Sequence, residues 1–369
     1  MIENPRRVAI GVLADPGLPA TLVDHLNETL DDDLRAAFGE SVHWTVDTVH
    51  DPFEAMYPDY TQLRAKAREH VRDTVWDVVI CVTDQPMRDE SGVFVASLDA
   101  AARVAVISLP ALGGFRPRHR LRATLVAIIA HLAAPSAGTA ELRRRLPEPA
   151  SHVLDAEPDS SNLNIIDPRR SAVSRLLAGM VRVNQPWRLL AGLSTALAGA
   201  LTGIAFGLLY SSIWTLSTAL GPIRLAGLIV VAVTALTVWI IAGHRLWERR
   251  DGRDVQVRLR NVSTVVTVTV GALAFFLTMF AISLGAVALV IPPDYLATTL
   301  GRAVDVTDYV VIAAMASVLG TLAGAVGSGL EDDTTVREAT YGYREQERHR
   351  RVQQQADDGT GPTHPYRRN

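Results

Sequence analysis

Four long apolar blocks dominate the second half of the chain. They cover Leu189–Ile213, Leu225–Gly243, Val262–Ile291 and Tyr309–Leu330, and none contains Asp, Glu, Lys, Arg or His between its ends. A helix needs about 20 predominantly apolar residues to cross a bilayer, and each block is close to that length or longer. Buried helices of a large soluble core are the alternative, but such helices rarely run this far without a charge. The pattern therefore predicts an all-α, four-helix transmembrane domain over residues 189–330.

The first half of the chain alternates instead between strand-like and helix-like patterns. Short apolar or alternating runs predict strands, and longer runs with apolar residues every three or four positions predict helices. The predicted strands are Arg7–Leu13, Val42–Val49, Asp77–Thr83, Val93–Leu98 and Val104–Leu109, and the predicted helices are Leu18–Phe38, Tyr60–Trp76 and Leu121–Leu132. This order, βαβαβββα, indicates an α/β domain over residues 1–134, with a mixed sheet that is mostly parallel at its centre and carries an antiparallel hairpin.

Three segments lie outside these two domains. Residues 135–168 are rich in Pro, Ser, Ala and charge, which is typical of a flexible linker. Residues 169–188 place Leu and Met on one side of a helix and arginines on the other, which predicts an amphipathic helix in the membrane interface. Residues 331–369 are expected to extend the last helix into the cytoplasm and to end in a disordered tail.

Arginines beside the apolar blocks predict the orientation in the membrane. The flank before the first block, the connection between the second and third, and the flank after the fourth carry at least five arginines each. The other two connections carry one each, Arg224 and Arg302. Because positively charged flanks stay in the cytoplasm, both termini are expected on the cytoplasmic side of the inner membrane. Met1–Ala14 is interpreted as a first strand and not a signal peptide, since Asp15 and Pro16 follow it in place of a cleavage site.

Small residues recur at four-residue spacing in the first and fourth blocks. Gly199, Gly203 and Gly207 share one helix face in the first, and Gly320 and Gly324 share one face in the fourth. Such stripes let helix backbones approach closely in a bilayer. They pack the helices of one chain together, or they form a homo-oligomer. No block contains an ionisable residue of the kind that marks ion pathways, which argues against a channel or transporter.

Polar and glycine residues follow the predicted strands of the first domain. In open α/β sheets, ligands bind beyond the carboxyl ends of the parallel strands. That rule nominates Asp15, Asp84 and Arg88 as catalytic candidates, and Asp51, Thr83, Gly113, Gly114 and Arg116 as ligand-binding candidates. The simpler interpretation is that Asp15 and Asp84 belong to turns or cap the helices that follow.

A basic strip interrupts an otherwise acidic domain. Residues 100–122 contain five arginines and no acidic residue, whereas residues 1–90 carry 8 basic and 18 acidic residues. The strip could hold an anion at a helix N-terminus beside Gly113 and Gly114, or rest on anionic lipid headgroups. A solvated helix end is the third interpretation and the one that we favour. The phosphate interpretation lacks a G-x-G-x-x-G or Walker A motif.

Signatures of several protein classes are missing. The ten histidines have no metal-ligand spacing, so no metal is predicted, and no cofactor motif is evident. No G-x-S-x-G elbow occurs. The single cysteine, Cys81, lies within an apolar strand and reads as a buried, inert thiol. The charge balance does not favour nucleic-acid binding.

Several longer motifs together resemble one protein family. They are "GVLADPGLP", "VVICVTDQP", "VISLPALGG", "RLLAGMVRVNQPWRLLAGLS" and "GSGLEDDTTVREATYGYR". With these motifs the chain resembles a family of actinobacterial integral membrane proteins that have an N-terminal α/β domain and four C-terminal transmembrane helices. The family's motifs carry no known chemistry, so the resemblance implies no catalytic residue. Some members carry the label methylene-tetrahydrofolate dehydrogenase. That enzyme family uses a Tyr-x-x-x-Lys pair, whereas the only lysine here, Lys66, lies six residues after Tyr60.

The sequence thus predicts a membrane-anchored cytoplasmic protein that binds a partner or a small ligand, in a regulatory or scaffold role. Its expected partners are the lipid bilayer, a second copy through the small-residue stripes, and a cytoplasmic protein or small ligand. An enzyme at the membrane face that uses the strand ends is the first alternative. A channel or transporter is the second.

Overall fold

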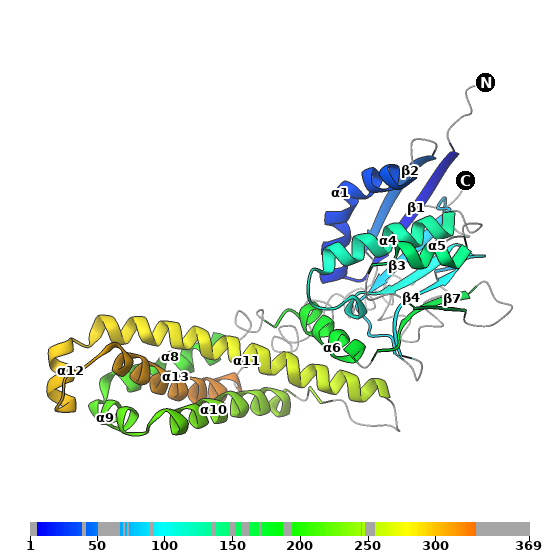
Figure 1. Ribbon diagram of the computed structural model, residues 1–369. Coiled ribbons are helices and arrows are strands. Elements are labelled where there is room, and N and C mark those ends of the chain that lie inside the picture. Colours follow the sequence, from blue (N-terminus) through cyan, green and yellow to red (C-terminus); the bar gives the residue numbers. More distant parts are fainter. Residues whose placement is uncertain are drawn as a thin grey trace, which may run out of the picture. The chain divides into compact units, whose positions relative to one another are not determined.

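The computed structural model of the chain is shown in Figure 1. It describes residues 6–38, 42–50, 67–68, 71, 74–88, 92–133, 138–147, 152–155, 162–169, 171–186, 194–244, 246–247 and 255–329. The chain divides into two compact units. The first comprises Met1–Val183 together with Tyr343–Asn369, and the second comprises Asn184–Gly342.

A mixed β-sheet forms the centre of the first unit. Within the described residues it has seven strands in the order β2-β1-β3-β5-β4-β7-β6. They are β1 (Arg6–Ala14), β2 (Val42–His50), β3 (Val78–Thr83), β4 (Val93–Asp99), β5 (Val104–Ser108), β6 (His152–Asp155) and β7 (Asn162–Asp167). β2, β1, β3 and β5 are parallel, whereas β4, β7 and β6 add antiparallel pairs. The predicted α/β class, with its parallel centre and its β4–β5 hairpin, is confirmed.

The segment expected to be a flexible linker contains regular structure. Residues 135–168 supply a short helix, α5 (Gly138–Arg145), as well as β6 and β7. β7 pairs along β4 from Val93 to Asp99, and Ile165 is completely buried. The short run Asn162–Asp167 is too polar to predict a strand by itself. Pairing with the exposed edge of β4 is what makes it one, because strand formation depends strongly on its neighbours.

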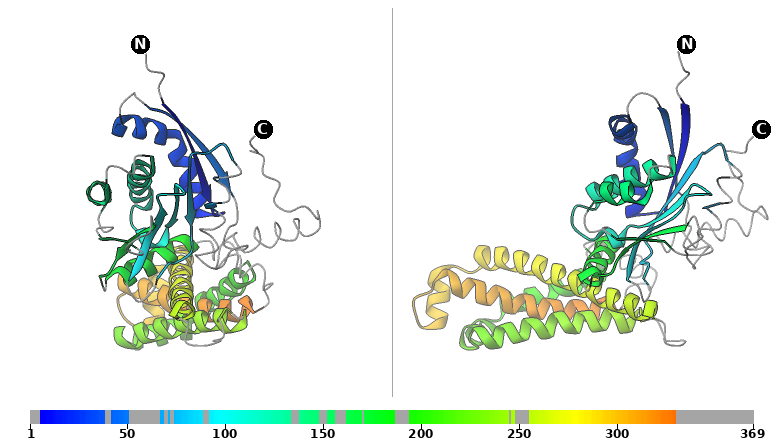
Figure 2. Two further views of the ribbon diagram at one scale, coloured as in Figure 1. Left: turned by 90° about the vertical axis from the view of Figure 1, so that its right-hand side faces the viewer. Right: turned by 45° about the vertical axis from the view of Figure 1, so that its right-hand side comes forward.

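Two helices cover one face of this sheet. α1 (Leu18–Phe38) and α4 (Pro117–Ala133) lie on the same side of it, and α5 lies beside α4 (Figures 1 and 2). The predicted apolar stripe of α1 is buried at Leu26, Leu30 and Leu34. The central strands β3 and β5 are buried at every position. Most of the predicted helix Tyr60–Trp76 lies outside the described residues.

The second unit is a bundle of helices. They are α8 (Ser194–Leu209), α9 (Ser211–Ala219), α10 (Pro222–Gly243), α11 (Val255–Val290), α12 (Pro293–Leu300) and α13 (Val306–Ser328). Among the described residues, three helices, α10, α11 and α13, are long and apolar enough to cross a membrane. A fourth span results if α8 and α9 are taken together, but these two are bent by 86°. The first predicted span is therefore broken at Tyr210, whose backbone is extended, with φ −100° and ψ 107°.

The surface of this bundle is apolar in a way that suits lipid. Only 33% of the apolar stretch of α10 and 28% of that of α11 is buried within the protein. Large side chains such as Ile223 (86% exposed) and Leu289 (87% exposed) point outward. Exposed aromatic residues mark both ends of the bundle, with Trp239 towards the end of α10 and Tyr295 in α12. Such aromatic residues are enriched at the two membrane–water interfaces.

The small-residue stripes lie where α8 and α13 meet. A Cβ atom added at Gly203 would come within 2.8 Å of the Cα of Gly320, and one at Gly207 within 2.6 Å of the Cβ of Ala316. Gly199 faces the carbonyl of Ala323 in the same way, and Gly324 faces the carbonyl of Ala196. These glycines thus let two helices of one chain touch through their backbones.

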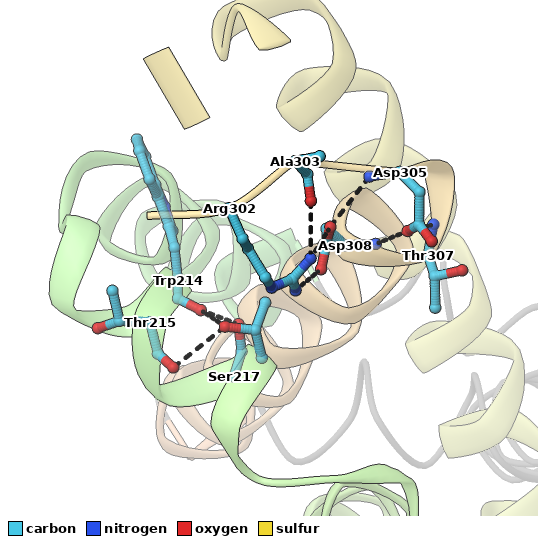
Figure 3. A network of polar contacts seen from close by, with 9 residues as sticks. Trp214, Thr215, Ser217, Arg302, Ala303, Asp305, Thr307 and Asp308 are labelled. Atoms are coloured by element: carbon cyan, nitrogen blue, oxygen red, sulfur yellow. Dashed lines mark hydrogen bonds and ion pairs between the residues drawn. The ribbon is translucent and has the colours of Figure 1, made fainter. Parts of the chain in front are cut away.

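A polar network holds the start of α13 (Figure 3). Arg302 forms a two-pronged ion pair with Asp308, whose Oδ2 also accepts a 3.0 Å hydrogen bond from the backbone N–H of Asp305. Asp305 in turn caps the helix by accepting from the N–H groups of Thr307 (2.8 Å) and Asp308 (3.2 Å). This reciprocal capping box satisfies donors that would otherwise lack partners at the first turn. α9 and α12 lie at the same end of the bundle (Figure 1).

Candidate functional site

The carboxyl edge of the parallel strands gathers three of the predicted site residues. Asp15 follows β1, Thr83 ends β3, and Asp84 comes next in the chain. The hydroxyl of Thr83 donates a 2.6 Å hydrogen bond to Oδ2 of Asp15, and the backbone N–H of Asp84 donates a 3.3 Å bond to the same oxygen. The topology rule for open sheets therefore placed these residues together correctly.

This edge is closed by its own contacts. Asp15 is fully buried, and Thr83 and Asp84 are 1% and 4% exposed. The Thr83 oxygen accepts from the N–H of Gln85 (3.1 Å), and Ser108 at the end of β5 donates to the Gln85 carbonyl (2.6 Å). The side chains thus join the ends of β1, β3 and β5. The carboxylate of Asp15 bonds the neighbouring strand, while its backbone carbonyl accepts from Ala20 in α1.

The remaining strand-end candidates lie elsewhere. Arg88 forms an isolated β-bridge with Val93, next to the start of β4. Gly113, Gly114 and Arg116 connect the short 3₁₀ helix η1 (Pro110–Leu112) to α4. Asp51 lies outside the described residues. Six of the eight candidates thus divide between a buried strand-end cluster and a loop.

The two glycines of that loop touch a helix that leaves the sheet at the same edge. α6 (Ser171–Asn184) packs so closely that a Cβ atom at Gly114 would come within 2.7 Å of the Ala178 carbonyl oxygen. One at Gly179 would come within 2.0 Å of the Pro110 carbonyl oxygen. These distances exclude any side chain larger than hydrogen at either position unless the backbone moves.

An ion pair fixes the start of α6 against the sheet. Arg175 is bonded to Asp167 at the end of β7, and that carboxylate is completely buried. The residues of the predicted interfacial helix that face inward, Leu176 and Met180, are 0% and 8% exposed. Protein thus covers these two residues of the apolar side, and the predicted place of this helix in the membrane interface stays a prediction. The pattern of an amphipathic helix is the same for both environments, so the sequence alone does not distinguish them.

An open groove on the helical face is the feature that the sequence did not reveal. It has a volume of about 530 Å³ and lies between α1, α4 and α5. Its lining residues are Asp33, Ala36, Ala37, His119, Arg122, Ala123, Val126, Ala127 and Arg145. The small side chains come from two separate helices, α1 and α4, whereas α5 supplies Arg145, so no single stretch of sequence marks them. We call the small side chains, mainly alanine, the floor of the groove and the charged side chains its rim.

Ion pairs hold the charged rim of the groove in place. Arg122 forms a two-pronged pair with Asp33, and this hydrogen bond raises the pKa of the Arg122 guanidinium further above its ordinary value. Arg145 donates from Nε to Glu141 (2.6 Å) and lies 5.4 Å from the centre of the Phe38 ring. The groove thus offers small apolar side chains beside paired charges.

No group of His, Cys, Asp and Glu suited to holding a metal ion occurs in the part of the chain that the structure describes. Comparison with known proteins adds no assignment: no family model matches the chain, and no curated protein or solved structure is significantly similar to it.

Proposed function

We propose that this chain is a multi-pass protein of the cytoplasmic membrane whose cytoplasmic α/β domain binds a partner protein. The observation that carries the proposal is the groove between α1, α4 and α5, on a domain covalently joined to helices of membrane-spanning length. An open groove with an alanine floor suits an apolar side chain from a partner's helix, because small residues allow close approach. Enclosed, deeper pockets are typical of small-molecule sites.

The charged rim supports a protein partner with polar residues of both signs. Arg122 and Arg145 line the groove together with Asp33, and the two arginines are paired with Asp33 and Glu141. Polar and charged residues around an apolar centre are the usual arrangement at protein interfaces, where complementary charges guide association and exclude wrong partners. Membership of the actinobacterial membrane-protein family is part of this proposal. Pro110 and Gly179, which lie in close contact, belong to two of the motifs that carry this resemblance. These motifs are "VISLPALGG" and "RLLAGMVRVNQPWRLLAGLS".

The membrane orientation is tested by cysteine labelling in cells. The native Cys81 is buried, so a cysteine placed at Arg35 or Thr298 is the accessible thiol. A membrane-impermeant maleimide should label the Thr298→Cys chain, in α12, in intact spheroplasts. It should label the Arg35→Cys chain, in α1, only after permeabilisation. The reverse pattern would contradict a cytoplasmic domain.

The groove is tested by site-specific crosslinking in cells. A photoreactive amino acid at Ala37, which lines the groove, should give an adduct of one defined mass. The same amino acid at Asp32, which lies on α1 outside the groove lining, is the matched control and should not. Ala123→Arg fills the groove and should abolish the adduct. Adducts that form equally at both positions, or that survive Ala123→Arg, would overturn the proposal. Turnover of a small molecule that depends on Asp84 would favour the enzyme alternative.

A further inference from the structure

The loop between η1 and α4 exposes an aromatic side chain on the first unit. Phe115 is 70% exposed. Among the described residues of this unit, the only other exposed large hydrophobic residue is Val75, at 48%. The second unit exposes many. The backbone on either side of this residue has an unusual conformation. Gly113 has φ 91° and Arg116 has φ 49°, and residues other than glycine rarely adopt a positive φ. An ordered loop thus presents a phenyl ring to its surroundings.

Positive charge surrounds this ring. The guanidinium of Arg116 lies 5.3 Å from the ring centre. Arg118 follows at the start of α4 and donates a 3.1 Å hydrogen bond to the backbone carbonyl of His25 in α1. Neither arginine forms an ion pair with any residue that the structure describes, whereas Arg122 is paired with Asp33. The first turn of α4 contains no acidic residue. Because a helix dipole disfavours cations at its N-terminus, helix stability does not explain these arginines.

We propose that Phe115, Arg116 and Arg118 dock the α/β domain on the anionic surface of the membrane to which the chain is anchored. An exposed aromatic ring beside cations matches the interfacial region of a bilayer, where the ring enters the headgroup layer and the cations meet lipid phosphates. A free phosphate ion would use the cations but not the ring. This proposal rests on the proposed membrane anchoring, but not on the groove or on its partner.

The tether favours lipid over a soluble partner. Gly114 lies against Ala178 of α6, and α8 begins only 16 residues later, at Ser194. Sixteen residues span at most about 55 Å when fully extended. The loop is therefore held within that distance of the first apolar helix. A lipid surface is present there at high effective concentration, whereas a soluble partner must arrive by diffusion.

The test uses the full chain reconstituted in vesicles. An environment-sensitive fluorophore on Phe115→Cys should be quenched by brominated lipids when the vesicles contain anionic lipid, and much less in neutral phosphatidylcholine. The matched control is Val75→Cys, the other exposed hydrophobic position, which precedes β3 and so lies at the opposite edge of the sheet. No quenching is expected there. Equal quenching at both positions, or none at either, would overturn the proposal.

Charge removal gives a second, independent measurement. The Arg116→Gln/Arg118→Gln chain should lower the docked-to-undocked ratio by about 25-fold, at about fivefold for each arginine near an anionic surface. Arg35→Gln/Arg103→Gln removes the same charge elsewhere and should leave the ratio unchanged. Quenching at position 115 that is equally strong in neutral vesicles would show insertion without recognition of anionic lipid. A fluorophore shielded from aqueous iodide but not quenched by lipid would show a protein partner. Either result overturns the proposal.

Discussion

The hydroxyl of Thr83 donates a 2.6 Å hydrogen bond to the buried carboxylate of Asp15 and so joins the ends of β3 and β1. Together with the N–H of Asp84, this donor compensates for removing the carboxylate from water. A buried carboxylate without its donors would be strongly destabilising. The contact therefore holds the carboxyl edge of the sheet in register.

Replacing Thr83 by Val should destabilise the α/β domain. The variant keeps the shape of the side chain but removes a donor to a buried charge, at a cost of about 2 kcal/mol in the free energy of unfolding. Urea unfolding of the full chain in detergent micelles measures the shift. Thr83→Ser retains the hydroxyl and should stay close to the native midpoint. A Val variant as stable as the native chain would show that the bond contributes nothing.

Filling the contact between α8 and α13 should disrupt the helical bundle. Gly203→Val introduces atoms where even a Cβ would lie 2.8 Å from Gly320, and overpacking of this kind costs about 1–3 kcal/mol. Gly227→Val in α10 is the matched control, because nothing lies within 4 Å of a Cβ at that glycine. Thermal melts in detergent, read by gel filtration, should show an early loss for the first variant only. Equal melts would contradict the described packing.

Removing the carboxylate of Asp308 should weaken the end of the bundle more than removing its cationic partner does. Asp308→Ala loses the ion pair and also the bond from the Asp305 N–H, a capping loss of about 1 kcal/mol. Arg302→Gln loses a half-exposed ion pair and an exposed hydrogen bond to the Ala303 carbonyl, which contribute less. The same thermal melts rank the two variants. An Arg302→Gln chain that is the less stable of the two would contradict the capping role.

The α/β domain should become less stable as the pH falls below neutrality. Burial lowers the pKa of His131 below its ordinary value of 6.5, so the unfolded chain binds this proton more readily than the folded one. The native state is therefore favoured above about pH 6.5 and loses stability as the pH falls through that value. Urea midpoints at pH 7.5 and 5.5 should differ less for His131→Leu than for the native chain. An unchanged difference would exclude His131 as the cause.

Much of the fold could be predicted because the signals are local and periodic. The alternation of strands and helices in residues 7–133 needs no knowledge of distant contacts, and neither does the apolar character of α10, α11 and α13. The strand-end cluster was also predictable, since chain topology alone brings Asp15 and Thr83 to one edge. β7 was missed because its pairing with β4 makes it a strand. The break at Tyr210 was missed because an apolar run has the same composition whether it is straight or bent.

The groove and the docked α6 show a different reason for failure. Ala37 and Ala123 carry no chemical signal, and they become neighbours only when α1 and α4 pack on the sheet. Gly179 could be recognised as special only after Pro110 had been placed against it. Sequence patterns indicate which side of a helix is apolar, but they do not show whether lipid or protein covers it.

The length of α11 has a practical consequence. Its 36 residues extend about 54 Å at the usual helical rise, whereas the hydrocarbon layer of a bilayer is about 30 Å thick. Several turns must therefore stand clear of the acyl chains, and Arg258 and Arg260 place those turns at the first end of the helix. An affinity epitope inserted just before Val255 would therefore lie outside the hydrocarbon layer, within reach of an antibody fragment.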